Sequence, residues 1–408
     1  MHDRYIDEEQ RRQLEPLMKP LTMHPSYYTV FRETIDTMLY GEGPLSADTR
    51  HYIALMAACR HQCQYMINFH KTEFARLGGN RTWLDGLNKA SPKIRSLDVL
   101  NRILAHQPWL LQTSHLQNLS QAPNPQNWSL SELLQAALIL SHIHALCSFV
   151  HAVGITSSSK SYSPTSTNGT SSPANDERFP SEQSDDVETL MATMEKLTQT
   201  ISECSMEEKQ QQFLAINMQN SEITTVDETN CTSACLSDCA LYTSDMVFTY
   251  EDFAKRNEAA AAPTFKIHDY SWDDQGYSVI SQLCSHLTNV VDQKFHLTRN
   301  LTYYTMGEHD GVDTSKYRTA VWNYIQSLYG IRHDDYDYAE VNKLLSRPMK
   351  TFIKTACCFP ERMTDRLRSS VMVDFHHSER IHVNMMIMEA RFQAAMLYLL
   401  RAIMRFMT

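Results

Sequence analysis

The fold class is decided by one apolar stretch, LLQAALILSHIHALCSFVHAVGI, which runs from Leu133 to Ile155. Its length is typical of a helix rather than a strand, and its apolar residues occupy every face of that helix, which indicates burial on all sides. A membrane span is the alternative for such a length, but His142, His144 and His151 would be costly in lipid. We therefore expect a buried core helix and no membrane insertion.

Helical patterning continues through most of the chain. Only 11 glycines occur in 408 residues, and Leu, Met, Ala, Gln and Glu dominate the periodic segments. Leu, Met, Ala, Gln and Glu are good helix formers, and the alternation of apolar and polar residues that is typical of strands is rare. Helices are predicted at 45–60, 62–77, 130–153, 187–214, 276–291, 313–329, 338–355 and 379–406. The sequence thus predicts an all-α protein.

A polar segment divides the chain into two halves. Residues 156–186 are rich in Ser, Thr, Pro, Asn and Asp and nearly free of large apolar side chains. Such a segment cannot bury enough surface to offset the entropy of ordering it. We predict an N-terminal helical domain at 10–155, a flexible, disordered linker at 156–245 with a helix at 187–214, and a C-terminal helical domain at 246–408.

The two halves share a pattern that suggests a duplicated helical unit. Gly43–Arg50 and Gly311–Arg318 each precede an apolar helix, and each half closes with a long helix rich in Leu, Ala and Met. The first apolar helix ends in Arg60-His61-Gln62-Cys63 and the second in Arg332-His333-Asp334-Asp335. Duplication is a hypothesis at this point, because the identity between the halves is low.

Composition and spacing exclude several classes of function. The net charge of −10 and the pI of about 6.0 disfavour nucleic acid or an anionic membrane surface as the main partner. The charged start of the chain predicts no secretory leader, so the ten scattered cysteines are expected to be free thiols in a cytoplasmic setting. Cys231, Cys235 and Cys239 are spaced more widely than metal-binding pairs usually are, and we expect no metal and no cofactor.

Cys63, Tyr65 and His70 form the first candidate site. A cysteine is reactive as its thiolate, and Cys63 follows Arg60 and His61 at a predicted helix start, where a cation and a helix N-terminus favour that form. Cys63 and His70 share one helix face but lie about 10 Å apart along it, so direct proton transfer needs a bend or a bridging group. The alternative is that Cys63 is a small buried hydrophobe and His70 a hydrogen-bonded core histidine.

A second candidate site combines hydroxyl groups with single charges. The segment Leu301–Met306 is rich in hydroxyls, and Arg318 and Glu379 are charges beside apolar helical segments. A free amino acid needs an anion for its ammonium group, a cation for its carboxylate and an apolar pocket. The alternative places Arg318 at the surface and makes Glu379 a helix N-terminal charge favoured by the helix dipole.

Two charged groups suggest partner contacts. Asp334 and Asp335 lie in a turn-like segment after an apolar helix, where a solvated acidic loop is the alternative. Arg347, Lys350 and Lys354 fall on one face of a predicted helix, where an ordinary solvated stripe is the alternative.

Several motifs together resemble the sestrin family. Those of the N-terminal half are Arg50–Ala54, His61-Gln62-Cys63 and Ala105–Leu110, and those of the C-terminal half are Tyr250–Phe253, Ala262–Phe265, His268–Trp272, Gly311–Thr314, Arg332–Tyr338 and His377–Asn384. The resemblance covers roughly 20–155 and 245–408. It implies two related helical domains, similar to AhpD-type hydroperoxide reductases.

The resemblance assigns roles to the first candidate site. In the family's AhpD-like half, the reactive cysteine, tyrosine and histidine correspond to Cys63, Tyr65 and His70. AhpD-type enzymes carry a second cysteine three residues after the first, where this chain has Met66. Catalytic turnover as a thiol-dependent alkyl hydroperoxide reductase would therefore need an outside thiol.

The resemblance also implies an amino-acid site, with leucine as the expected ligand. Glu379 would hold the ammonium group and Arg318 the carboxylate. The residues expected to close over or line the pocket are Thr302, Tyr303, Thr305, Thr314 and His382. Met372 stands where leucine-sensing relatives have a tryptophan, and Tyr317 where they have a leucine, so charge recognition is expected to be retained while selectivity is open.

Partner binding is the last expectation from the resemblance. Asp334 and Asp335 match an acidic pair that binds the second GATOR complex, and Arg347, Lys350 and Lys354 match a contact with Rag GTPases. The chain would then restrain TOR complex 1 signalling as a stress and nutrient regulator in the cytoplasm, with the nucleus as a second compartment. The alternative function is hydroperoxide reduction through Cys63.

Overall fold

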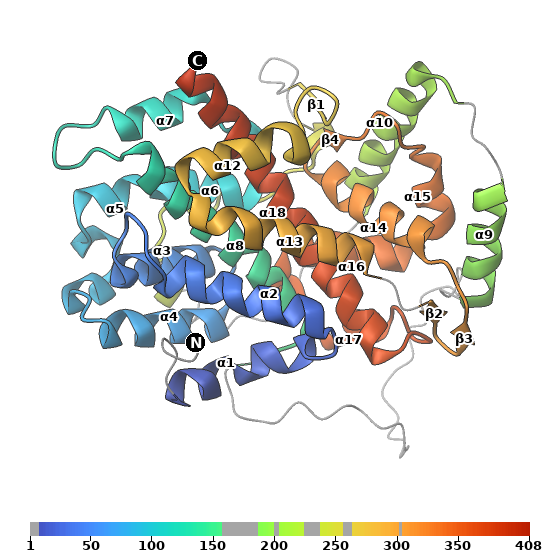
Figure 1. Ribbon diagram of the computed structural model, residues 1–408, viewed down its shortest axis with the longest axis horizontal. Helices are drawn as coiled ribbons and strands as arrows, with labels where there is room; N and C mark the ends of the chain where they lie inside the picture. Colours follow the sequence, from blue (N-terminus) through green and yellow to red (C-terminus); the bar gives the residue numbers. More distant parts are fainter. Residues whose placement is uncertain (1–7, 157–186, 200–203, 224–236, 256–262, 302–303) are drawn as a thin grey trace.

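The computed structural model describes residues 8–156, 187–199, 204–223, 237–255, 263–301 and 304–408, and over these ranges the all-α prediction is confirmed (Figure 1). The N-terminal half contains α1 (Glu8–Leu21), α2 (Pro25–Ile35), η1 (Asp36–Tyr40), α3 (Ala47–Arg60), α4 (Gln64–Arg76), η2 (Arg81–Asp85), η3 (Leu87–Lys89), α5 (Pro92–Ser96), α6 (Asp98–His106), η4 (Pro108–Leu110), α7 (Thr113–Ser120) and α8 (Leu130–Val153).

The C-terminal half follows two intervening helices, α9 (Val187–Gln199) and α10 (Met206–Glu222). It contains η5 (Phe253–Lys255), η7 (Trp272–Gly276), α12 (Tyr277–Leu283), α13 (Ser285–Asn300), α14 (Ser315–Leu328), α15 (Ala339–Leu344), α16 (Arg347–Cys358), η8 (Pro360–Arg362), α17 (Asp365–Ser369) and α18 (His377–Met407). The described residues also contain four two-residue strands: β1 (Phe265–Lys266) pairs in parallel with β4 (Ile331–Arg332), and β2 (Thr305–Met306) pairs antiparallel with β3 (His309–Asp310).

Several predicted helices are divided in the structure. The segment 338–355 forms α15 and α16, because Ser346 caps the amide of Met349 and Pro348 follows in the first turn of a new helix. The segment 276–291 is divided at Cys284 between α12 and α13. The segment 187–214 contains α9 and the first part of α10.

The two long helices α8 and α18 form the centre of the molecule and pack against each other along their length (Figure 1). Capping boxes begin both helices: Ser129 pairs with Glu132 at the start of α8, and His376 with Glu379 at the start of α18. Among the described residues, α8 is the one helix long and apolar enough to cross a membrane, and its apolar window is wholly buried inside the protein. The predicted core helix is therefore confirmed.

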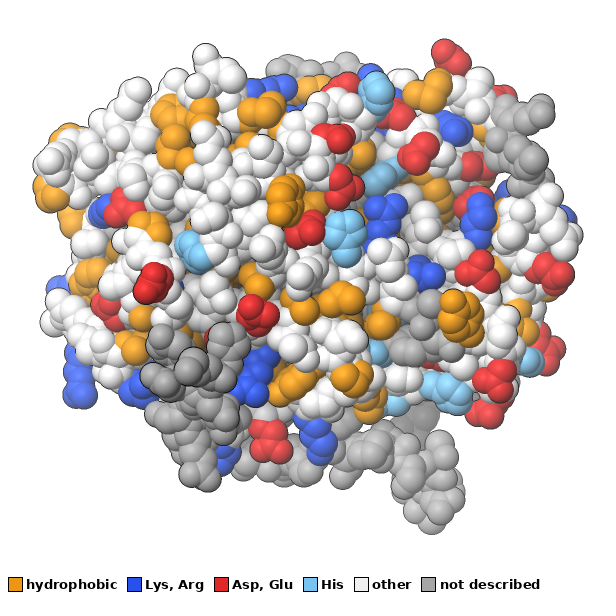
Figure 2. Space-filling model, viewed as in Figure 1, with side chains coloured by type: hydrophobic (Ala, Val, Ile, Leu, Met, Phe, Trp, Pro, Cys, Tyr) orange, Lys and Arg blue, Asp and Glu red, His pale blue; other side chains and the backbone are white. Residues whose placement is uncertain are grey.

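One hydrophobic core runs through both halves. Helix α2 of the first half packs on α13 of the second, while α9 packs on α14 and α15, and α10 on η5 and α14. The structure thus joins the two predicted domains through shared packing, and their division at 156–245 stays a prediction. Charges of both signs are scattered over the face drawn in Figure 2.

The ends of α3 and α14 support the duplication hypothesis. After α3, Gln62 adopts the left-handed conformation (φ 49°), and after α14 Gly330 does the same (φ 73°). A side chain at Gly330 would lie 2.3 Å from the ring of Phe253, so glycine is required there for space as well as for conformation. This geometry pairs Cys63 with Ile331, which corrects the pairing of Arg60–Cys63 with Arg332–Asp335 suggested by the sequence.

A second pair of turns repeats in both halves. Gln107 ends α6 with φ −139° and ψ 64°, and Phe359 ends α16 with φ −140° and ψ 54°. A proline-led 3₁₀ turn follows each, η4 and η8, and then a short helix precedes the long one. Since Glu132 and Glu379 both occupy the third position of their long helices, α8 and α18 can be compared residue by residue.

Candidate functional sites

A tight turn between α3 and α4 places Cys63. The amide of Cys63 donates to the carbonyl of Ala58 at 3.1 Å, and the amide of Gln62 to that of Cys59 at 3.1 Å. These two bonds, with Gln62 in the left-handed conformation, form a Schellman motif. Cys63 is then the N-cap of α4, so its sulfur lies at a helix N-terminus, where negative charge is stabilised.

Two side chains from α8 meet this sulfur. Cys63 hydrogen-bonds with Cys147 and with His151, and the thiol is almost fully buried. Burial raises the pKa of Cys63, but these hydrogen bonds, the charge of His151 and the amide of Met66 lower it to about 5. Burial lowers the pKa of His151, whereas its contact with Cys63 raises it more, so the net shift is upward. The site therefore favours a thiolate paired with an imidazolium.

Tyr65 and His70 make their hydrogen bonds elsewhere, although Tyr65 lies close enough to Cys63 for their charges to interact. The Tyr65 hydroxyl donates to the carbonyl of Gln13 at 2.6 Å, and His70 Nδ1 lies 3.0 Å from Nδ1 of His51. The histidine that meets Cys63 is His151, which the sequence reasoning did not select. A signal was present, because Cys147 and His151 are four residues apart on the predicted core helix and share one face.

Glu379 is the centre of the second site. Its buried carboxylate accepts hydrogen bonds from Thr305 Oγ1 at 2.8 Å, from the amide of Gly307 at 3.0 Å and from the amide of His376 at 2.8 Å. A carboxylate has about four acceptor positions. These bonds fix the orientation of Glu379 at the N-terminus of α18 and join the β2–β3 hairpin to it. In Figure 1 the hairpin lies beside the start of α18.

Arg318 contacts the C-terminal end of α13. Its guanidinium donates to Thr314 Oγ1 at 3.2 Å and to the carbonyl of Arg299, while His382 Nε2 lies 2.8 Å from the carbonyl of Thr298. Burial lowers the pKa of Arg318, and burial lowers that of His382 to about 4, with Arg318 among the further causes. The structure thus brings Arg318, Thr314 and His382 together at one helix end.

The remaining pocket residues are placed as follows. Met372 is buried and adopts the left-handed conformation (φ 52°) in the turn before α18. Tyr317 is buried with its ring centroid 5.8 Å from that of Phe375. Thr302 and Tyr303 lie outside the described residues.

The expected partner-binding residues differ in exposure. Asp334 pairs with Arg332, while Asp335 is exposed and its carbonyl accepts from Lys209 of α10 at 3.2 Å. Of the three basic residues, Arg347 is exposed, but Lys350 and Lys354 are buried.

Both buried lysines have internal partners. Lys350 hydrogen-bonds to Asn342, and burial lowers its pKa to about 8. Lys354 lies 2.9 Å from Asp252 and donates to the carbonyls of Asn220 and Ile223 at the end of α10. The expected basic face is therefore largely internal, because these two lysines join α16 to α15 and α10.

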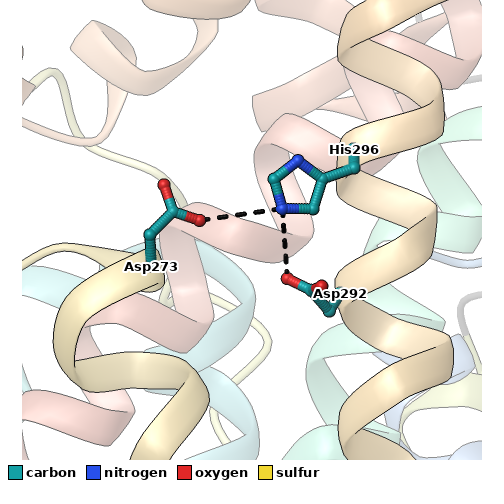
Figure 3. Close-up of side chains that lie close together, drawn as sticks. All are labelled: Asp273, Asp292 and His296. Carbon is teal, nitrogen blue, oxygen red and sulfur yellow. Dashed lines mark ion pairs between the residues drawn. The ribbon is translucent and has the colours of Figure 1, made fainter.

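One group of potential metal ligands lies at the surface. Asp273 of η7 faces Asp292 and His296, which are one turn apart on α13 (Figure 3). His296 Nε2 lies 3.8 Å from Asp273 and 3.4 Å from Asp292, and Asp292 also accepts from the indole of Trp272 at 2.9 Å. These contacts give the three side chains an ordinary role in joining η7 to α13.

Comparison with known proteins decides the family. A family model described as PA26 p53-induced protein (sestrin) matches residues 2–407. The chain belongs to the sestrin family. It is 42% identical to Sestrin-2 of Homo sapiens, covering 95% of this chain and 82% of that protein. It is 39% identical to a sestrin homolog of Drosophila melanogaster, covering 99% of this chain and 94% of that protein, and 39% identical to Sestrin-1 of Xenopus laevis. As a sestrin, the chain is a stress regulator in the broad sense.

Proposed function

We propose that this sestrin binds a free amino acid, with leucine as the expected ligand, in its C-terminal half. The observation that carries the proposal is the buried Glu379 carboxylate, held in a fixed orientation by Thr305, Gly307 and His376. A ligand ammonium group has a charge-assisted partner there. Arg318 supplies a cation for the ligand carboxylate, and buried Met372 and Tyr317 supply apolar surface.

The β2–β3 hairpin gives the ligand a way to change the protein's shape. Thr305 and Gly307 belong to this hairpin and share the Glu379 carboxylate, so an ammonium group bound at Glu379 competes with or reinforces their hydrogen bonds. A ligand shifts an equilibrium only when it interacts differently with the two states. We therefore expect the hairpin to be the element that responds to the ligand.

The partner part of the proposal is binding to the second GATOR complex, through which the chain restrains TOR complex 1 signalling in the cytoplasm or the nucleus. Asp335 is the exposed member of the acidic pair, and α10 lies beside it through Lys209. A Rag GTPase contact at Arg347, Lys350 and Lys354 would meet Arg347 first, because the two lysines are buried.

Capture of purified second GATOR complex on the immobilised chain, with and without leucine, tests this proposal. We expect leucine to change the captured amount, and Asp335→Ala to reduce capture in both conditions. Arg347→Ala serves as the matched surface control. Equal capture with and without leucine would contradict amino-acid gating, and no capture in either condition would contradict the partner.

Hydroperoxide reduction at Cys63 is a second candidate function. The observation that favours it is the contact of a buried cysteine at a helix N-terminus with His151. A thiolate is the nucleophile that peroxide chemistry needs, and an imidazolium can protonate the departing alkoxide. Cys63→Ser is expected to abolish any peroxide consumption and to leave amino-acid binding unchanged.

A further inference from the structure

Three functional groups meet at the α3–α4 turn. Cys63 ends the turn, while Cys147 and His151 lie one helical turn apart on α8 and both contact its sulfur. Cys147 is fully buried and Cys63 almost fully, while His151 is partly exposed. Among the described residues, these three groups are not one of the clusters whose ligand atoms converge as a metal site requires.

The C-terminal half has matching turns but carries other residues at the places of these groups. His151 Nε2 lies 3.1 Å from the carbonyl oxygen of His61, and at the equivalent place the Tyr398 hydroxyl donates to the carbonyl of Tyr329 at 2.8 Å. The alignment of α8 with α18 pairs Cys147 with Ala394, and the alignment of the two left-handed turns pairs Cys63 with Ile331. The hydrogen bond to the turn is kept in both halves, while the two thiols occur in one. Isoleucine and alanine are therefore sufficient for a purely structural role at these two positions.

We propose that Cys147 is the resolving cysteine of Cys63, and that the two form an intramolecular disulfide when the chain meets a hydroperoxide. The choice of a hydroperoxide as the oxidant rests on the second candidate function, hydroperoxide reduction at Cys63. The pairing of the two cysteines does not rest on it. The sequence position three residues after Cys63 holds Met66, so the second thiol comes from α8 rather than from α4. This assignment supplies within the chain the thiol that was expected from outside.

The chemistry balances in two steps. The Cys63 thiolate attacks one oxygen of the hydroperoxide: an S–O bond forms, the O–O bond breaks, and His151 gives its proton to the alkoxide, which leaves as an alcohol. Cys147 then attacks the Cys63 sulfenic acid: an S–S bond forms, the S–O bond breaks, and hydroxide leaves with the Cys147 proton as water. Two thiols are oxidised and one hydroperoxide is reduced. An external dithiol restores the pair.

Two further cysteines, Cys59 and Cys239, are the alternatives to Cys63 and Cys147 as sites of oxidation. Cys59 hydrogen-bonds with Cys239, and Cys147 lies close enough to Cys59 for their charges to interact. Burial raises the pKa of both Cys59 and Cys147 well above the usual value, whereas Cys63 has a helix N-terminus and His151 beside its sulfur, which favour its thiolate. The first oxidation should therefore fall on Cys63, and its nearest reductant is Cys147.

Disulfide mapping on the full-length chain tests the proposal. The chain is reduced with dithiothreitol, exchanged into oxygen-free buffer, treated with equimolar hydrogen peroxide, blocked with N-ethylmaleimide and digested for mass spectrometry. We expect a peptide pair joined by Cys63 and Cys147, and little labelling of Cys63 by dimedone, which traps sulfenic acid. A disulfide that joins other cysteines, with Cys63 still reduced, would overturn the proposal.

A variant and its control separate the two steps. Cys147→Ala copies the residue found at the equivalent position 394, so we expect it to fold, to lose the disulfide and to accumulate severalfold more dimedone-labelled Cys63. Cys357→Ala, at another buried cysteine, should behave as the wild type. Equal dimedone labelling of Cys63 in the wild type and in Cys147→Ala would retain the peroxide reaction but refute a resolving Cys147. If Cys63 is unreactive in both the wild type and Cys147→Ala, the peroxide reaction and the Cys63–Cys147 disulfide are both refuted. If the variant does not fold, the disulfide map of the wild type alone tests the proposal.

Discussion

The side chains of His151 and Tyr398 occupy matching places in the two halves: each lies within hydrogen-bond distance of the backbone carbonyl of the residue just before a left-handed turn, His61 in one half and Tyr329 in the other. The comparison extends to Glu132 and Glu379, which open the two long helices. In the first half Glu132 pairs with Lys93, whereas in the second Glu379 binds the β2–β3 hairpin. The halves thus share a framework and differ in the chemistry placed on it.

His151→Gln should shift the pH dependence of Cys63 oxidation. In the wild type the pKa of Cys63 is about 5, so its reaction with hydrogen peroxide should be nearly constant from pH 8 down to about 6 and fall below that. Glutamine can still donate to the His61 carbonyl but carries no charge. The pH at which Cys63 reacts at half its maximal rate should therefore rise by at least one unit. The measurement is the rate of dimedone-trapped Cys63 against pH, and an unchanged midpoint would remove His151 from the site.

Arg318→Ala should weaken amino-acid binding more than tenfold, because a ligand carboxylate would be left without its cation at a cost of about 2–5 kcal/mol. Lys316→Ala is the matched control, since Lys316 lies on the same helix and pairs instead with Glu340 at 3.0 Å. Calorimetric titration of both variants gives the comparison. Similar losses in the two variants would indicate a general effect of positive charge rather than a specific contact.

Lys354→Ala should destabilise the protein by about 1–3 kcal/mol, because it removes the nearer cation of the largely buried Asp252 and leaves only Lys255, at 3.9 Å. It also removes the bond from Lys354 to the carbonyl of Ile223 at the end of α10. Arg347→Ala, at the exposed start of the same helix, should stay within about 0.5 kcal/mol of the wild type. Urea unfolding measures both. If Lys354→Ala is as stable as Arg347→Ala, Lys354 is available to partners after all.

Acid should destabilise the protein steeply below pH 6.5. Burial lowers the histidine pKa values to about 3 at His51 and about 4 at His382, and well below the usual value at His61, His70, His106, His142 and His144. The unfolded chain then binds more protons than the folded one, so stability is fully present above pH 6.5 and is lost as the pH falls, by about 1.4 kcal/mol per histidine per pH unit.

Urea unfolding at pH 7.5 and at pH 5.5 measures this loss. His106→Gln should reduce the change in the free energy of unfolding per pH unit by the contribution of one histidine. Equal stability at the two pH values would mean that the buried histidines are charged in the folded state.

The sequence predicted the fold class because α8 and α18 are long, apolar and free of helix breakers. It also predicted that Cys63 and Glu379 lie at helix N-termini, for Glu379 as the alternative to a ligand contact, since each residue type suits that position. It could not predict that His151 meets Cys63, because that contact depends on how α8 packs against the α3–α4 turn. Nor could it predict that Lys354 is buried, since a basic residue at helical spacing looks the same on either face. Partners from distant segments are set by tertiary packing.

Titration of the purified chain with leucine by calorimetry, beside Glu379→Gln and Glu132→Gln, tests amino-acid binding most directly. Glutamine can replace glutamate in a capping box, so both variants should stay folded. We predict saturable binding of about one leucine per chain in the wild type and in Glu132→Gln, and a loss of more than tenfold in Glu379→Gln, where the ammonium group loses its charged partner. No leucine binding by the wild type, or equal affinity in Glu379→Gln, would contradict an amino-acid site at the start of α18.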